Sequence, residues 1–372
     1  GRGSSEFTRF DGNLAGTDGL PDLLSGALSV SPTALERYAL CPHEYFVQRM
    51  LRVSPVESPE EVLEISAMDF GNFVHECLDD LISEAGEAGR LPDFGAPWTR
   101  AQHLRLREIG EAKSTEYVAA GRVGHRLLWA RARLELLATL DWMLTEDSRW
   151  RAEQGARVVA SELAFGLDDQ PAVEIQVAGG VLRFRGKADK VDERRDGSLL
   201  VTDVKSGSPT GFKGLGETNP VADGEKLQLP VYAHAARARH GQPTTPVEAM
   251  YWFVRKHRRR VQLPLTDGVQ RVYAATVGLL ARSLAAGVFP PRAPATPDHG
   301  WVTCPYCNPD GLGHSDVRSR WEAKRLAPQL VDYTRLVEPA AVPPVADEDD
   351  GGGGTGDGHI PVLGTGGRGP RR

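Results

Sequence analysis

The sequence predicts an α+β fold in which a small mixed sheet is flanked by helices and preceded by a large helical region. Apolar residues recur at helical spacing up to about residue 152. Short runs rich in β-branched and aromatic residues then follow, and turn signals separate them. The chain has 372 residues, of which 40% are hydrophobic and 25% are charged. This composition can supply the core of one large domain or of two small ones.

The helical part, at about residues 29–152, opens at Ser31, a capping residue followed by Pro at the first helical position. Cys41 and the proline after it interrupt this helix before its continuation. A second helix is expected from about 70 to 85, and a long helical region from about 99 to 150. Up to this point the chain has the pattern of an all-α protein.

The sheet part, at about residues 153–290, is where the pattern changes. Strands are expected at 157–165, 172–177, 181–192, 198–204, 247–254 and 260–265. Helices are expected at 224–240 and 267–286. Asp168-Asp169 and Asp196-Gly197 are turn signals between strands. A cysteine-containing segment, at about 291–337, completes the predicted domain.

The two ends differ in composition from the rest of the chain. Residues 1–28 lack periodicity, and residues 338–372 are acidic and rich in glycine. Both are expected to be unstructured, which leaves a folded unit at about 29–337. Because the chain begins with Gly rather than Met, we expect a processed product or a piece of a longer protein.

Composition also bears on where in the cell the protein is expected and on how its cysteines are used. The chain has no run of about 18 apolar residues and no apolar signal core, so a cytoplasmic location is expected. The net charge of -6 argues against a surface coated in basic residues. Two of the four cysteines form Cys304-Pro-Tyr-Cys307, which suits a metal or cluster site better than a disulfide framework.

A dense basic run joins the last two predicted strands. Its members are Arg255, Lys256, Arg258, Arg259 and Arg260. One interpretation is that these side chains contact DNA phosphates, an attraction that is independent of base sequence. The other is a solvated hairpin tip, since short basic runs are weak indicators by themselves.

Two carboxylates are expected to meet across the Asp196-Gly197 turn. A tight hairpin there pairs Asp189 with Asp203 to within one residue of register. Residues opposed in this way have Cβ atoms about 4.5 to 5.5 Å apart. Two carboxylates so close repel each other unless a cation lies between them.

Lys205 extends this pattern, because period-two alternation places it on the same face as Asp203. Carboxylate oxygens beside an ammonium suit a hard divalent ion and an activated water, which is the chemistry of hydrolysis. The alternative is a strand-to-strand ion pair between Asp189 and Lys205, with Asp203 capping the turn.

The two acids and the lysine resemble the metal-binding core of the PD-(D/E)XK nuclease superfamily, and further motifs resemble its RecB/AddB-type branch, including actinobacterial RecB-family proteins. His75 is the last residue of a Gly-x-x-x-His motif on the helix expected at about 70 to 85, and Asp189 is the last residue of a Gly-x-x-Asp segment. Glu162 lies in what resembles the branch's acidic strand, and Gln228 with Tyr232 forms a Gln-x-x-x-Tyr motif. Taken singly, His75 also fits a packed histidine, and the last motif also fits a helix face that bonds to a neighbour.

The resemblance implies a restriction-endonuclease-like core and a set of site residues. Catalytic roles are implied for Glu162, Asp189, Asp203, Lys205, Gln228 and Tyr232. His75, Asp189 and Asp203 would bind Mg²⁺ or Mn²⁺, and Glu162 would add a ligand through water. Lys205 would position the attacking water, and the Gln-x-x-x-Tyr pair would support that lysine or the DNA.

The cysteines follow the same resemblance. In AddB-type nuclease domains, an upstream cysteine joins a C-terminal Cys-x-x-Cys and a further cysteine to bind an iron-sulfur cluster. Cys41 matches the upstream member, and Cys304 with Cys307 matches the pair. The fourth cysteine is missing, and His314 is a candidate to replace it, which would suit Zn²⁺ as well as a [4Fe-4S] cluster. An eroded site is the alternative, and Cys77 is expected to be a core residue.

The function implied by the resemblance is that of a magnesium-dependent deoxyribonuclease, of the exonuclease kind, in DNA repair and recombination. Its substrate would be single-stranded DNA or duplex ends. Such domains accompany a superfamily 1 helicase, and this chain lacks the Gly-x-x-x-x-Gly-Lys-Ser/Thr motif. The motor is therefore expected on another chain or in a missing portion. Two rival interpretations are a catalytically silent DNA-binding or scaffold domain and a zinc module that organises partners.

Overall fold

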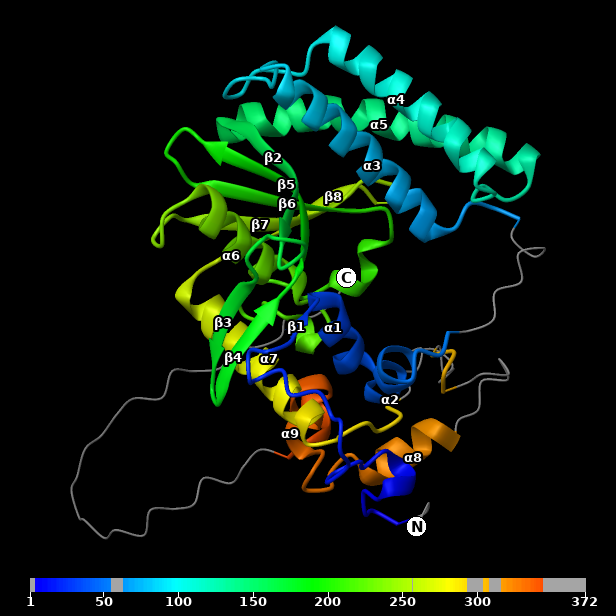
Figure 1. Ribbon diagram of the computed structural model, residues 1–372, viewed down its shortest axis with the longest axis vertical. Helices are drawn as coiled ribbons and strands as arrows, with labels where there is room; N and C mark the ends of the chain where they lie inside the picture. The colour runs from blue at the N-terminus through cyan, green and yellow to red at the C-terminus, as the bar shows by residue number, and fades with distance from the viewer. Residues whose placement is uncertain (1–3, 55–62, 256, 293–303, 308–315, 344–372) are drawn as a thin grey trace, which may run out of the picture. The chain divides into compact units, whose positions relative to one another are not determined.

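The computed structural model describes residues 4–54, 63–255, 257–292, 304–307 and 316–343 (Figure 1). Its helices are α1 (Pro32–Leu40), α2 (Pro42–Tyr45), α3 (Ala67–Glu87), α4 (Arg100–Ala119), α5 (Arg126–Gln154), α6 (Gln228–His240), α7 (Asp267–Ala285), α8 (Asp316–Lys324) and α9 (Val331–Val337). Its strands are β1 (Ser29–Val30), β2 (Ala156–Phe165), β3 (Val173–Val177), β4 (Gly180–Phe184), β5 (Gly186–Arg194), β6 (Leu199–Lys205), β7 (Val247–Phe253) and β8 (Arg259–Pro264).

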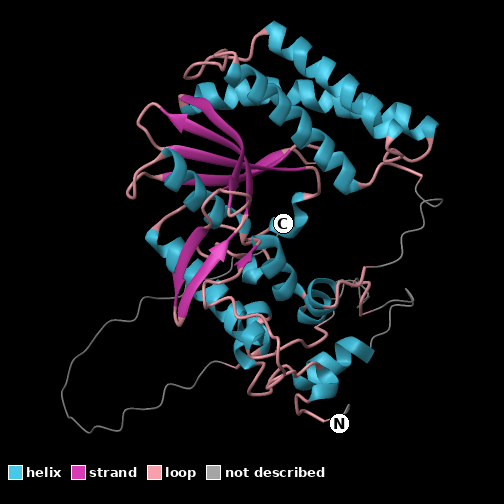
Figure 2. Ribbon diagram, viewed as in Figure 1, coloured by secondary structure: helices cyan, strands magenta, loops and turns pink. Residues whose placement is uncertain are grey.

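A five-stranded sheet with the order β2-β5-β6-β7-β8 forms the centre of the fold. Strands β6 and β7 run parallel, and the other neighbouring pairs run antiparallel. The parallel pair is joined through α6, as a crossover between parallel strands requires. The expected mixed sheet, flanked by helices and preceded by a large helical region, is confirmed (Figure 2).

Helices α3, α4 and α5 cover one face of this sheet, and α6 and α7 lie on the other side (Figure 1). On the first face, Phe73 and Leu140 from the helices share a core with Val204 and Trp252 from the strands. On the second face, Val231 of α6 is buried in a larger core that also takes in α1, α7 and α9. Each central strand is therefore covered on both faces, and the polar side chains of β6 are mostly buried.

The expected strand at 181–192 is two strands that belong to different sheets. Strand β4 pairs with β3 and β1 in a three-stranded sheet, whereas β5 pairs with β2 and β6. Arg185 lies between the two strands, and its backbone N–H donates to the carbonyl of Val30 on β1, which holds this end of β4 in the three-stranded sheet. The sequence prediction missed this break because alternation of apolar residues continues through it.

The N-terminal segment differs from its expected disorder. Over residues 4–28, Phe7 and Leu23 are buried in the larger core. Asp11 pairs with Lys324 of α8, whose Nζ also donates to the carbonyl of Glu6 at 2.7 Å. These contacts are long-range, so a segment without periodicity can be ordered by tertiary packing that a local pattern does not reveal. Of the expected C-terminal tail, residues beyond 343 lie outside the described part.

Within the described residues, no helix combines the length and the apolar character that crossing a membrane requires.

Candidate active site

The hairpin of β5 and β6 has the register that the Asp196-Gly197 turn predicts. Lys190 pairs with Thr202 and Val191 with Val201, and Asp189 and Asp203 each lie one residue beyond the Lys190–Thr202 pair that ends the ladder. Asp189 Oδ2 accepts a hydrogen bond from the backbone N–H of Val204 at 2.6 Å. This bond crosses from β5 to β6 and fixes the Asp189 carboxylate against the partner strand.

Helix α3 brings His75 to the same point. Its Nδ1 lies 3.2 Å from Asp189 Oδ1. A Cβ at Gly71 would lie 3.2 Å from Ser206 Oγ, so glycine one turn before His75 allows α3 to pass close to the end of β6. The Gly-x-x-x-His spacing therefore has a packing reason as well as a chemical one.

Glu162 completes a cluster with His75 and Asp189. One possible ligand atom from each of the three lies within 4.8 Å of the other two. Glu162 has a φ of 44° within strand β2, a conformation that costs energy for a residue with a side chain and that is common at functional sites. Its Oε2 also lies 3.4 Å from Lys187 Nζ. Glu162, whose role the sequence motifs supported least, therefore lies beside Asp189.

Asp203 and Lys205 face α6 on the neighbouring side. Asp203 is buried, and its Oδ2 lies 2.6 Å from Lys205 Nζ. The Lys205 ammonium lies 5.4 Å from the centre of the Tyr251 ring. On α6, Gln228 Nε2 donates to Tyr232 Oη at 3.0 Å, and both side chains are buried. The alternative ion pair between Asp189 and Lys205 is absent from the ion pairs of the described residues, where Lys205 contacts Asp203.

Burial and neighbouring charges separate the pKa values of these groups. Burial raises the pKa of Asp203 to about 7, with Lys205 opposing and Asp189 adding to the shift. Burial also acts to raise the pKa of Asp189, but attraction to His75 outweighs it and the pKa is lowered. For His75, burial acts to lower the pKa, and Asp189 and Asp203 raise it to about 9. The histidine therefore neutralises part of a strongly negative site.

The donor set fits a divalent cation. An imidazole nitrogen and carboxylate oxygens within reach of one another are ligands that Mg²⁺ or Mn²⁺ accepts. Burial and repulsion from Asp189 raise the pKa of Glu162, although attraction to Lys187 and His75 opposes the shift. A cation held by His75, Glu162 and Asp189 would relieve the repulsion between the two acids.

The three predicted cysteine ligands lie close together at the end of α1. The sulfurs of Cys41, Cys304 and Cys307 lie within 4.8 Å of one another, and Cys41 Sγ is 3.6 Å from Cys307 Sγ. Contacts with Cys304 and Cys41 raise the pKa of the Cys307 thiol, because three thiolates this close repel one another. A soft cation would relieve that repulsion. The candidate fourth ligand, His314, lies outside the described residues, and Cys77 is a buried core residue of α3.

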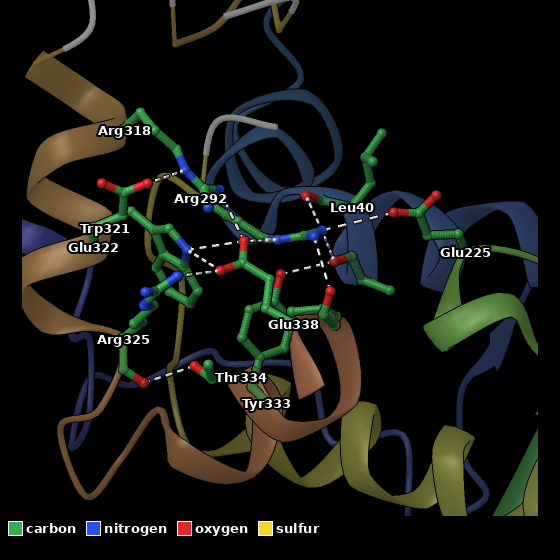
Figure 3. Close-up of polar contacts among 12 residues, drawn as sticks. Leu40, Glu225, Arg292, Arg318, Trp321, Glu322, Arg325, Tyr333, Thr334 and Glu338 are labelled. Atoms are coloured by element: carbon green, nitrogen blue, oxygen red, sulfur yellow. Dashed lines mark hydrogen bonds and ion pairs between the residues drawn. The ribbon is translucent and has the colours of Figure 1, made fainter. Parts of the chain in front are cut away.

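A cluster of arginines around Glu338 holds the same end of α1 (Figure 3). Glu338 Oε1 lies 3.2 Å from Arg292 Nε and 2.8 Å from Arg318 Nη1. Arg292 also donates to the carbonyl of Leu40 at 3.2 Å, next to Cys41. Nothing in the sequence pattern identified Glu338, since it begins the segment that was expected to be a disordered tail.

The basic run at 255–260 makes contacts within the chain. Arg255 pairs with Glu135 of α5 at 2.7 Å, and Arg260 pairs with Glu146 at 2.8 Å. Arg258 stacks over the Trp142 ring at 3.9 Å. These contacts attach the β7–β8 hairpin to α5. Contact with DNA stays a prediction, for which the exposed Arg258 and Arg259 are the available side chains, and Lys256 lies outside the described residues.

A buried network of ion pairs around Lys190 lies beside the site, and the sequence prediction did not include it. Lys190 Nζ contacts Asp147 of α5 and lies 2.7 Å from Asp192 Oδ2. Asp147 also pairs with Arg151 at 2.8 Å and accepts from Trp98 Nε1. All four charged residues are buried. Strand β5 carries charged residues along most of its length, so nothing in the sequence pattern indicated that Lys190 and Asp192 in particular would be buried.

The chain is similar in sequence to several curated proteins. Several curated relatives are named as a subunit of an ATP-dependent helicase/deoxyribonuclease. The relative from Clostridium perfringens is 25% identical over 242 residues, which is 62% of this chain and 19% of that protein. The relative from Desulforudis audaxviator is 29% identical over 270 residues, which is 69% of this chain and 21% of that protein. The relative from Lacticaseibacillus casei is 28% identical over 257 residues, covering 66% of this chain and 21% of that protein.

The chain therefore spans about a fifth of the length of these curated relatives. A family model described as the PD-(D/E)XK nuclease superfamily matches residues 29–310, which include the hairpin acids, His75 and the helix that bears Gln228. The match covers most of the chain, so this protein belongs to the PD-(D/E)XK nuclease superfamily.

Proposed function

We propose that this chain is a metal-dependent deoxyribonuclease that hydrolyses phosphodiester bonds of DNA. The observation that supports it most directly is the convergence of His75, Glu162 and Asp189 at one end of the sheet. Asp203 and Lys205 lie on the adjoining strand, where Asp203 faces the ammonium at 2.6 Å. A silent scaffold would have no need to hold the Glu162 and Asp189 carboxylates so close together beside a buried Asp203, because repulsion between carboxylates costs stability.

In this proposal, different residues bind the metal ion, position the attacking water and support the lysine or the DNA. His75, Glu162, Asp189 and Asp203 would hold Mg²⁺ or Mn²⁺, which supplies an activated water and neutralises developing negative charge. The Lys205 ammonium holds the attacking water and adds positive charge beside the phosphate. Gln228 and Tyr232, joined by a hydrogen bond, support Lys205 or the DNA from α6.

The relatives suggest a wider context. Their printed name joins a helicase and a deoxyribonuclease, and this chain matches about a fifth of each relative. We propose that this chain supplies the nuclease part of such a system in double-strand break repair and recombination. The helicase would then lie on another chain or in a further portion of the same protein, and exonuclease action on DNA ends is the proposed mode.

A cleavage assay tests the proposed function. Purified protein is incubated with end-labelled single-stranded and duplex DNA, in the presence of Mg²⁺ or of a chelator. We expect products that depend on Mg²⁺ and disappear with the chelator, because the carboxylates alone cannot activate water. Products that form equally well in the chelator would contradict the proposal. Absence of cleavage with the helicase partner also present would favour a silent scaffold.

We infer further that Cys41, Cys304 and Cys307 bind a metal or a [4Fe-4S] cluster. The support is the approach of the three sulfurs to within 4.8 Å, in a setting that the Glu338 cluster holds in place. Thiolate ligands suit both Zn²⁺ and iron-sulfur clusters.

Replacing Cys304 with Ala is expected to remove the bound metal. For a cluster, the anaerobically purified protein shows a broad visible absorption band that the variant lacks. For zinc, about one equivalent is found by elemental analysis and is lost in the variant. Cys77→Ala is the matched control, since Cys77 is a buried thiol of α3 outside the cysteine cluster. Wild-type protein with neither iron nor zinc would contradict the inference.

A further inference from the structure

Helix α6 begins without a cap of its own. Its first residue, Gln228, belongs to the Gln-x-x-x-Tyr pair of the site, and the residue before it is Leu227. Leu227 has no side-chain acceptor for the free N–H groups of the first turn. Such groups need a partner when they are buried, and Leu227 and Gln228 are both buried.

Glu36, on α1, supplies the missing acceptor. Its Oε1 accepts a hydrogen bond from the backbone N–H of Leu227 at 2.6 Å. The backbone N–H of Gln228 also stabilises the charged carboxylate. The contact spans 191 residues of sequence, so it is a cap made by tertiary structure. A carboxylate at a helix N-terminus is further favoured by the helix dipole.

The same carboxylate lies within the electrostatic surroundings of the site. Burial raises the pKa of Glu36, and attraction to Lys226 and Lys205 opposes that shift. Glu36 in turn contributes to raising the pKa of Lys205, after Asp203 and Asp189. One half-buried acid therefore contacts the start of the helix that carries Gln228 and Tyr232 and also attracts Lys205 of the site.

Helix α1 is held firmly enough to serve as a support. Tyr333 Oη donates to the carbonyl of Ala39 at 2.7 Å, and Arg292 donates to the carbonyl of Leu40 at 3.2 Å (Figure 3). The Tyr38 hydroxyl donates to the carbonyl of Val288 at 2.6 Å. These contacts anchor the end of α1 one turn after Glu36, and so fix the carboxylate relative to the sheet.

We propose that Glu36 is a positioning residue for the catalytic centre, which holds the first turn of α6 so that Gln228 and Tyr232 meet Asp203 and Lys205. This role rests on the proposed nuclease function. Glu36 acts through α6 and touches neither DNA nor metal ligands. A misplacement of about 1 Å at a catalytic group can cost about 100-fold in rate, so a loosened first turn is enough to reduce turnover.

The test compares Glu36→Ala and Glu36→Gln with wild-type protein in Mg²⁺-dependent cleavage of a labelled DNA. We expect Glu36→Ala to lower kcat by at least about tenfold, with KM for DNA within about twofold. Glu36→Gln keeps an oxygen that accepts from Leu227 N–H, and it is expected to retain kcat within about threefold. Amide hydrogen exchange at Leu227 and Gln228 is expected to accelerate in the Ala variant alone.

Thr266→Ala is the matched control. Thr266 caps α7, and its Oγ1 accepts from the backbone N–H of Val269 at 3.3 Å. Loss of this cap is expected to lower the melting temperature as Glu36→Ala does, but to leave kcat unchanged. A fall in kcat that merely follows lost stability would appear in both variants and would overturn the positioning role.

Two further results are distinguishable. Wild-type cleavage with an unchanged Glu36→Ala variant would contradict only the positioning role. Wild-type protein without any cleavage would contradict the proposed function, and unchanged exchange at Leu227 in Glu36→Ala would separately overturn the cap. If Glu36→Ala does not fold, Glu36→Gln still tests the proposal. A tenfold loss of kcat in Glu36→Gln would contradict the positioning role, because an oxygen that accepts from the Leu227 N–H would then not be enough to keep the site active.

Discussion

Replacing Asp203 with Asn abolishes Mg²⁺-dependent DNA cleavage in this account, with a loss of about 1,000-fold or more in kcat. Asn has nearly the same shape as Asp but carries no charge. The substitution removes a carboxylate that lies 2.6 Å from Lys205 and close enough to Asp189 for the two charges to repel each other. Single-turnover cleavage of a labelled DNA by purified wild-type and variant protein measures the effect.

The matched control is Asp169→Asn, in the exposed turn after β2. It removes the same charge from the chain but lies outside the cluster, so cleavage is expected to stay within about twofold, as for most surface substitutions. Both variants should fold, and circular dichroism checks this. Retention of more than about a tenth of the activity by Asp203→Asn would exclude Asp203 from the catalytic set.

Replacing Lys190 with Met is expected to destabilise the protein by about 3 to 5 kcal/mol, because it removes one partner of a buried ion network. Lys190 contacts Asp147 and lies 2.7 Å from Asp192 Oδ2. Asp147 would keep Arg151 as a partner, whereas Asp192 would lose its only ion-pair partner among the described residues. Burial already raises the pKa of Asp192 to about 6, so its charge depends on this lysine.

The free energy of unfolding, obtained from urea titration at neutral pH, measures the loss. Arg157→Ala is the matched control, since it breaks the more exposed ion pair with Glu193, on β2 and β5 of the same sheet. Exposed pairs contribute about 0 to 1 kcal/mol. Equal losses in the two variants would contradict the assigned importance of the buried network.

The parts of the site that the sequence predicted correctly are those set by local geometry. Asp196-Gly197 specifies a tight turn, and a tight turn specifies which residues of β5 and β6 face each other, so the register of the hairpin followed from spacing alone and brought Asp189 and Asp203 to the same end of it. His75 and the Gln228–Tyr232 pair came from motif resemblance, because no local rule relates α3 or α6 to the hairpin.

The parts that were missed depend on contacts between distant segments. Glu36 is an ordinary polar residue of α1 until α6 packs against it, 191 residues later in the chain. The break between β4 and β5 at Arg185 is invisible to alternation, because both strands alternate. The ion pairs of Arg255 and Arg260 with acids of α5 could not be read from the basic run itself, because they form only where α5 lies beside the β7–β8 hairpin.

Anomalous diffraction can test whether His75, Glu162 and Asp189, with Asp203 on the adjoining strand, bind a divalent cation. Crystals of the protein soaked in Mn²⁺ are measured at a wavelength where manganese scatters anomalously. The account predicts an anomalous peak within bonding distance of Asp189 and His75, and the loss of that peak in crystals of Asp189→Asn. Crystals that diffract well and bind Mn²⁺ only elsewhere, or a peak that persists at full height in the variant, would contradict it.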